Sequence, residues 1–132
     1  DLFAHADGER IEQVLFNLVD NAIKYGKTGG RTVIHGRPAA PGWIEVSVQD
    51  DGPGIPPDSR ERLFERFFRV DKARSREQGG TGLGLAIVKH IVQCHGGEVG
   101  LESQPGQGAT FRFTLPVRAV NGVASKAATP ND

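Results

Sequence analysis

Apolar residues recur at helical spacing in two stretches of the chain and alternate with polar residues in several shorter ones. The first repeat forms one apolar stripe, which predicts a helix from Gly8 to about Tyr25 with Asp7 as its N-cap. That stripe consists of Ile11, Val14, Leu15, Leu18, Val19, Ala22 and Ile23. The stretch from Leu83 to His95 has the same period and predicts a second helix, which ends at Gly96-Gly97.

Four other segments are bounded at one end or both by glycine or proline and predict strands. They are 32–35, 43–49, 98–102 and 109–115. Short turns join the first two and the last two, so each pair is expected to form a hairpin. A short strand at 2–4 and a helix that starts near Pro57 and carries Leu63, Phe64, Phe67 and Phe68 complete the expected elements.

This order of elements predicts a layered α+β domain in which about three helices cover one face of a mixed sheet. Residues 1–116 are expected to form that domain, and 117–132, rich in Ala, Asn and Ser without periodicity, a flexible tail. The 132 residues suffice for one domain that buries roughly two thirds of its unfolded surface. Residues 69–82 contain hardly any apolar side chains, and so long a loop inside a compact domain is usually functional or disordered.

Charge and cysteine content narrow the functional classes. The formal net charge is zero, with 16 basic and 16 acidic residues, which argues against bulk attraction to nucleic acid. Any anion binding must therefore be local. The single cysteine, Cys94, excludes an internal disulfide and fits a reducing compartment. No run is long and apolar enough to cross a bilayer, so we expect a cytoplasmic domain, although its parent could be anchored in the inner membrane.

A polar line lies beside the apolar stripe of the first helix. Asn17, Asn21 and Lys24 are spaced i, i+4 and i+7, so they share one side of that helix. Asparagine is a poor helix former, and an ordinary solvated flank is the competing interpretation. Amide oxygens can ligate a hard cation and an ammonium group can bind phosphate, so the line is a candidate site for a metal and an anion.

Two glycine-containing segments are the other candidates for chemistry. The run from Gly79 to Leu85 leads directly into a helix, where free N–H groups favour phosphate; a glycine hinge is the alternative. Asp50 follows an apolar strand and precedes Gly52 and Gly54. Its carboxylate could accept the exocyclic amine of adenine, although capping a turn is the more common role of such an aspartate.

Taken together, these segments resemble four motifs of bacterial sensor histidine kinases, within the superfamily that also includes gyrase-type and chaperone-type ATPases (GHKL). The resemblance covers roughly residues 1–116, and the motifs follow the order of the family. They are the N box at Asn17-x-x-x-Asn21-Ala22-x-Lys24-Tyr25, the G1 box at Asp50-x-Gly52-x-Gly54, the F box at Phe64-Glu65-Arg66-Phe67-Phe68-Arg69, and the G2 box at Gly80-Thr81-Gly82-Leu83-Gly84-Leu85. The closing strand, Gly108-Ala109-Thr110-Phe111, is similar as well.

The resemblance implies a two-layer α/β sandwich that binds Mg²⁺ and ATP. In such a site Asn21 would ligate Mg²⁺, and Asn17 would support the metal or its waters. Lys24 would bind phosphate and Arg69 would reach the terminal phosphate, so that Lys24, Arg69 and Asn17 are the residues implied in catalysis.

The same resemblance assigns the nucleotide base and the mobile segment. Asp50 would accept the adenine amino group, Tyr25 would pack on the base, and Thr110 would lie at the floor of the pocket. The rest of that pocket would be lined by Gly52, Gly54 and Ile55. Residues 72–79 would be a mobile ATP lid, and its phosphate-facing hinge would comprise Gly80, Thr81, Gly82, Leu83, Gly84 and Leu85. Two departures are Phe68, where tyrosine is common, and Gly26-Lys27 in place of Thr/Ser-Pro.

The implied activity is that of the catalytic domain of a histidine kinase, whose acceptor histidine lies elsewhere. None of the four histidines falls in the acceptor motif of the family, so the expected partner is a dimerisation and histidine-phosphotransfer domain of the parent. The receiver domain of a response regulator is a further expected partner, reached through that parent. The fragment itself is expected to be a monomer. A hydrolase of the superfamily would carry a Glu base where this chain has Asn17. A non-catalytic module that binds nucleotide and docks a partner is the third interpretation.

Overall fold

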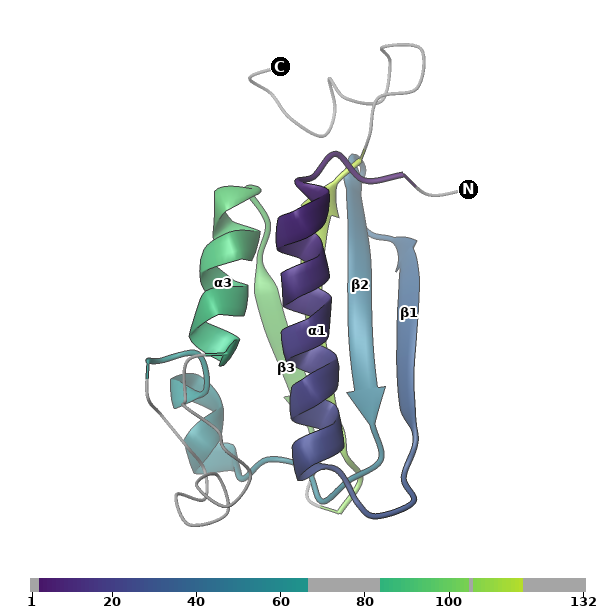
Figure 1. Cartoon of the computed structure of the whole chain (residues 1–132), viewed down its shortest axis with the longest axis vertical. Coiled ribbons are helices and arrows are strands. Elements are labelled where there is room, and N and C mark those ends of the chain that lie inside the picture. The colour runs from purple at the N-terminus through teal and green to yellow at the C-terminus, as the bar shows by residue number, and fades with distance from the viewer. Residues whose placement is uncertain (1–2, 67–83, 105, 118–132) are drawn as a thin grey trace.

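The computed structural model describes residues 3–66, 84–104 and 106–117, except the side chain of Tyr25. Two α-helices lie side by side over one face of a four-stranded sheet (Figure 1). The elements, in chain order, are α1 (Gly8–Tyr25), β1 (Thr32–Pro38), β2 (Trp43–Asp50), the 3₁₀ helix η1 (Pro57–Arg62), α3 (Gly84–Cys94), β3 (Val99–Ser103) and β4 (Ala109–Pro116). The α+β sandwich predicted from the sequence is therefore confirmed.

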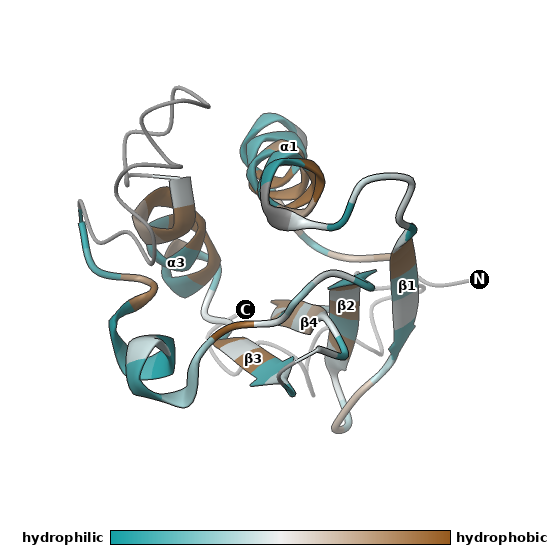
Figure 2. Ribbon diagram, turned by 90° about the horizontal axis from the view of Figure 1, so that it is seen from below, coloured by the Kyte–Doolittle hydropathy of each residue, from teal (hydrophilic) through white to brown (hydrophobic). Residues whose placement is uncertain are grey.

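Helix α1 begins where its cap predicts. The Asp7 carboxylate accepts the backbone N–H of Glu9 at 3.1 Å and that of Arg10 at 3.4 Å, which satisfies two donors of the first turn. Val14 and Leu18, in the centre of the apolar stripe, are fully buried. Seen along the helices, the apolar side of α1 faces the sheet and its polar side faces away (Figure 2).

The sheet has the order β1-β2-β4-β3, and every ladder in the described part of the chain is antiparallel. The sequence led us to expect a mixed sheet. The difference arises because β4, the second strand of the C-terminal hairpin, pairs with β2, while β3 takes the edge. Had β3 lain beside β2, that pair would have been parallel.

Strand β4 shows which face of the sheet forms the core. Its residues alternate between buried Ala109, Phe111, Phe113 and Leu115 and half-buried Thr110, Arg112 and Thr114. The buried set packs against the apolar sides of both helices, including Val14, Leu18, Val88, Ile91 and Val92. Phe64 adds an edge-to-face contact with Phe111 at a centroid distance of 6.2 Å.

Two segments differ from the expected elements. The helix expected from Pro57 onward is a 3₁₀ helix over Pro57–Arg62, with Leu63 and Phe64 after its end; Phe67 and Phe68 lie outside the described residues. Ala4, expected in a short strand, forms an isolated bridge with Val117. Val117 also donates to the Gly42 carbonyl at 2.9 Å, so the contacts of the domain extend to this first residue of the expected tail. The remainder of that tail, 118–132, is outside the described residues.

No helix within the described ranges meets the length and hydropathy that a membrane span requires.

Candidate functional site

The polar line of α1 faces the start of α3. The side-chain amide of Asn17 donates from Nδ2 to the backbone carbonyl of Gly84 at 3.3 Å, across 67 residues of sequence. A Cβ placed at Gly84 would lie 4.0 Å from Cγ of Asn17, which shows how near the Asn17 side chain lies to the start of α3. The amide oxygen of Asn17 is the acceptor of this side chain, and it is the atom that could meet a metal-bound water. The contact joins the N-box and G2-box segments.

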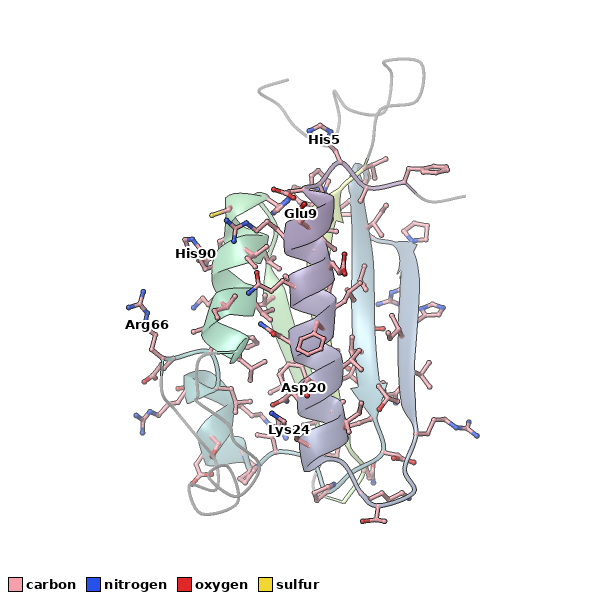
Figure 3. The ribbon with its side chains drawn as sticks, viewed as in Figure 1. His5, Glu9, Asp20, Lys24, Arg66 and His90 are labelled. Carbon is pink, nitrogen blue, oxygen red and sulfur yellow. The ribbon has the colours of Figure 1, made fainter. Side chains whose placement is uncertain are left out.

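Asn21 and Lys24 continue this line toward the end of α1. Asn21 is half-buried, one turn after Asn17. Lys24 lies in the last turn, with its ammonium 3.1 Å from the Asp20 carboxylate, and Figure 3 shows both at the same end of the helix. Lys24 has a further interaction besides that ion pair. An ammonium at a helix C-terminus is favoured by the helix dipole.

The 50–55 loop lies directly beside the end of α1. A Cβ on Gly52 would come within 2.8 Å of Cα of Gly26, the residue that follows the helix. Gly52 also donates its N–H to Oδ1 of Asp50 at 2.9 Å, which holds the carboxylate in one orientation. Gly52 is buried, and Ile55 packs against the core. Thus the structure brings together the G1 loop, the last turn of α1 and, through Asn17, the start of α3.

Asp51 secures the loop between α1 and β1. Its Oδ1 accepts the backbone N–H of Arg31 at 2.8 Å, and its Oδ2 lies 3.7 Å from the ammonium of Lys27. The Arg31 hydrogen bond, and then the charge of Lys27, lower the pKa of the Asp51 carboxyl below its ordinary value. The sequence analysis assigned no role to this residue, which follows Asp50 immediately.

Ser103, which the sequence analysis missed, and Gly108, which it noted only in the closing strand, fix the G1 loop from the side of the sheet. Ser103, the last residue of β3, accepts the Ile55 N–H and donates to the Gly108 carbonyl. Gly108 has a φ of 84°, and a Cβ there would overlap the carbonyl oxygen of Asp50. A polar residue at an alternation position that should be apolar was the available signal for Ser103.

The structure places Thr110 on the face of the sheet that the helices do not cover. It pairs with Gln49 and Glu102 and shares a sheet face with Arg112. Asp50 lies two residues after buried Val48 in β2 and therefore lies on the opposite face, with Val48. Successive side chains of a strand point to opposite faces, so Ala109, not Thr110, lies on the face that the helices cover. The role implied for Thr110 at the floor of an adenine pocket stays a prediction.

Several candidates cannot be placed. Arg69, the lid at 72–79 and the first four residues of the G2 box, Gly80, Thr81, Gly82 and Leu83, lie outside the described residues, as does the side chain of Tyr25. The described part of the G2 box is Gly84 and Leu85, and Leu85 packs against the core.

The donors present fit Mg²⁺ better than a metal held wholly by protein. Within residues 3–66, 84–104 and 106–117, no group of three or more His, Cys, Asp or Glu side chains could hold a metal ion. Mg²⁺ keeps several waters and takes oxygens from phosphates, so one or two protein oxygens suffice. The amide oxygens of Asn21 and Asn17, one helical turn apart, meet that requirement.

Comparison with known proteins shows the family of the chain. Residues 6–119 match the family model of histidine kinase-, DNA gyrase B- and HSP90-like ATPases. The chain is 46% identical over 119 residues to the sensor histidine kinase WalK of Bacillus subtilis (89% of this chain, 20% of WalK). It is 57% identical over 100 residues to the sensor-like histidine kinase SenX3 of Mycolicibacterium smegmatis (76% of this chain, 26% of SenX3). It thus spans about a quarter or less of these relatives.

Solved structures lead to the same family. The mycobacterial sensor histidine kinase MprB superposes with a TM-score of 0.77 at 38% identity, covering 89% of this chain and 78% of that one. Full-length ShkA, solved in complex with AMPPNP, also gives 0.77, at 37% identity, covering 91% of this chain and 24% of ShkA. The chain therefore belongs to the family of histidine kinase-, DNA gyrase B- and HSP90-like ATPases, in the branch formed by the catalytic domains of sensor histidine kinases.

Proposed function

We propose that this chain binds Mg-ATP and donates the γ-phosphoryl group to a histidine on a separate dimerisation domain of its parent protein. The observation that carries the proposal is the convergence of three motifs. The Asn17 amide contacts Gly84 of the G2 box, and Gly26 at the end of α1 packs against Gly52 of the G1 box. Groups suited to metal, phosphate and base thus border one region, formed by the end of α1, the start of α3 and the G1 loop.

Asp50 is the residue proposed to recognise the adenine base. Its Oδ1 accepts the Gly52 N–H, so the carboxylate is oriented before any ligand arrives. A carboxylate accepts hydrogen bonds and suits the exocyclic amine of adenine, while the 6-oxo group of guanine would face it as a second acceptor. Gly52, Gly54 and Ile55 line this end of the site, and Tyr25 is assigned to pack on the base.

The phosphate end is assigned to α1 and to the segment that precedes α3. Asn21 would hold Mg²⁺ and Asn17 one of its waters, and Lys24 and Arg69 would bind phosphate oxygens. When bound, Mg²⁺ would neutralise part of the charge on the phosphates. Residues 80–85 would offer backbone N–H groups to the phosphates ahead of α3. Phosphoryl transfer requires chiefly positioning and charge neutralisation, which these residues supply.

The neutral amide side chain of Asn17 favours transfer to histidine over hydrolysis. In the transfer, a bond forms between a ring nitrogen of the acceptor and the γ-phosphorus, and the bond from that phosphorus to ADP breaks. Hydrolysis needs a base to take a proton from water, and a neutral amide cannot take one. Moreover, the Asn17 amide is held by the Gly84 carbonyl. The parent would then pass the phosphoryl group to a response regulator, from a cytoplasmic catalytic domain.

The experiment is transfer from labelled ATP to a separately supplied histidine acceptor domain. The chain alone should bind Mg-ATP without forming stoichiometric phosphohistidine, and adding the acceptor domain should give labelled acceptor. Asn21→Ala should abolish labelling, whereas Gln13→Ala, which removes an exposed amide from the same helix, should leave it intact. Unchanged transfer by Asn21→Ala would refute the proposed site, and stoichiometric self-labelling would refute the separate acceptor.

A further inference from the structure

Ser103 interrupts the apolar pattern on the core face of β3. Val99, Leu101 and Ser103 pair with Phe113, Phe111 and Ala109, so all three lie on the face of the sheet that the helices cover. Ser103 is buried, with 6% of its surface exposed. Within the described ranges it is the one buried residue with a polar side chain. A buried hydroxyl costs stability unless it is hydrogen-bonded, so its partners indicate why it is there.

Both partners of the hydroxyl belong to the border of the proposed base pocket. The backbone N–H of Ile55 donates to Oγ of Ser103 at 2.8 Å, 48 residues away in sequence. The hydroxyl in turn donates to the carbonyl of Gly108 at 3.0 Å. One side chain therefore connects the end of the G1 loop to the turn between β3 and β4.

Backbone contacts between the same two segments show that the fit is close. Gly106 donates its N–H to the Pro53 carbonyl at 2.8 Å. A Cβ at Gly54 would lie 2.6 Å from the Gln104 carbonyl oxygen and 2.9 Å from Oγ of Ser103. The loop that carries Asp50 is thus seated against the turn, and the Ser103 hydroxyl supplies two of the hydrogen bonds in that contact.

Arg60 connects a third segment to this residue. Its guanidinium donates from Nη2 to the backbone carbonyl of Ser103, which anchors η1 at the end of β3. The side-chain hydroxyl and the main-chain carbonyl of Ser103 therefore have separate partners. Removing the hydroxyl alone would break its hydrogen bond to the G1 loop while leaving the Arg60 contact available.

We propose that Ser103 is a positioning residue for nucleotide-base recognition, acting through Ile55 and Gly108 without contacting the nucleotide itself. This inference rests on the proposed function. With the hydroxyl in place, the loop 50–55 is held in one position, and the carboxylate of Asp50 is ready to accept the adenine amine. Without it, the loop must be ordered at the moment of binding, which lowers affinity.

The test compares a ligand that has a base with one that lacks it. Dissociation constants for Mg-ATP and for inorganic triphosphate with Mg²⁺ are measured on the full chain, its Ser103→Ala variant and a control. Ser103→Ala should weaken ATP binding roughly tenfold, the factor that corresponds to the loss of one buried hydrogen bond of about 1.4 kcal/mol. Triphosphate binding should change less than twofold. The control is Ser47→Ala, which removes a hydroxyl that donates to the His35 carbonyl in the outer part of the sheet.

The outcomes separate a role of Ser103 in base recognition from a role in folding only. Equal weakening of ATP and triphosphate would mean that Ser103 serves folding only, and unchanged ATP affinity would also overturn its assigned role. If Ser103→Ala does not fold, amide hydrogen exchange of the unmodified chain decides: the Ile55 N–H should be protected without nucleotide, and exchange at the rate of an open loop would overturn the inference. If the unmodified chain binds triphosphate but not ATP, or neither, the proposed function fails and this inference with it.

Discussion

The backbone N–H of Asp7 donates a 2.9 Å hydrogen bond to Nε2 of His95, 88 residues later in the chain. The other ring nitrogen, Nδ1, lies 2.8 Å from the carbonyl oxygen of Ile91, which can only accept. The two contacts together require the neutral ring with its proton on Nδ1. His95 thus ties the end of α3 to the N-cap of α1, while Asn17 ties the start of α3 to the middle of α1. The two helices run antiparallel between these ties.

Replacing His95 should loosen this packing. His95→Ala removes the acceptor of the Asp7 N–H and the donor to Ile91, so we expect a loss of about 1–2 kcal/mol in the free energy of unfolding. Urea denaturation measures it. The control is His90→Ala on the same helix, where the exposed ring projects outward (Figure 3). That change should stay within about 0.5 kcal/mol, as is usual for exposed sites. Equal effects of the two substitutions would show that His95 does not join the helices.

A second prediction concerns the amide of Asn17. Asn17→Asp keeps the size of the side chain but replaces the donor to the Gly84 carbonyl with an acceptor, so the two oxygens would repel each other. We expect the free energy of unfolding to fall by about 1–2 kcal/mol and transfer to the acceptor domain to be lost. Gln13→Glu makes the same chemical change on an exposed part of α1 and should alter neither quantity. Full transfer by the Asn17→Asp variant would show that Asn17 has no part in the proposed site.

The regular elements could be predicted from the sequence because local signals coincide there. Helix α1 has the predicted bounds, since the Asp7 cap, the apolar stripe and the glycine after Tyr25 agree. Helix α3, expected over 83–95, is described over Gly84–Cys94, and β2 over Trp43–Asp50 for an expected 43–49. Leu83 lies outside the described residues, and the other differences, of one residue each, are the usual uncertainty at element ends.

The pairing of the strands and the residues that hold the candidate site could not be predicted, because they depend on contacts between segments distant in sequence. The antiparallel sheet follows from which hairpin strand reaches β2, and no local pattern encodes that choice. Alternation marks Ser103 as a polar residue on a core face, but its partner Ile55 lies 48 positions away in sequence. Thr110 was implied by resemblance to a closing strand, but the alternation of β4 assigns the core face to Ala109. The candidate site could therefore be predicted by its motifs, but not by the residues that hold those motifs in place.

A third prediction follows from the lowered pKa of Asp51. The Arg31 N–H, and then the charge of Lys27, favour the ionised carboxylate in the folded chain. A folded-state pKa below the ordinary value of 3.8 contributes stability that is present above that value and is lost as the pH falls through the folded-state pKa. Asp51→Asn should therefore be less stable than the unmodified chain at neutral pH, and the difference should shrink below about pH 3.8.

Urea denaturation of both proteins over a pH series measures this difference. Asp58→Asn serves as the control, because Asp58 is an exposed aspartate in the first turn of η1. Its free energy of unfolding is measured over the same pH series. A difference between Asp51→Asn and the unmodified chain that stays constant down to about pH 3 would contradict the role given to the Asp51 carboxylate.

The last prediction separates crowding from backbone strain within one turn. Gly106 and Gly108 both have positive φ, 79° and 84°, so alanine is strained at either position. They differ in their surroundings: a Cβ at Gly106 would meet nothing within 4 Å, while one at Gly108 would overlap the Asp50 carbonyl oxygen.

Gly106→Ala should therefore lower the free energy of unfolding by about 1 kcal/mol, the cost of the left-handed backbone alone. Gly108→Ala should lower it by about 3 kcal/mol or more and weaken ATP binding, because the strand end that carries Asp50 must move. Urea denaturation and ATP titration of the two variants measure both effects, and equal losses would mean that the turn does not press on Asp50.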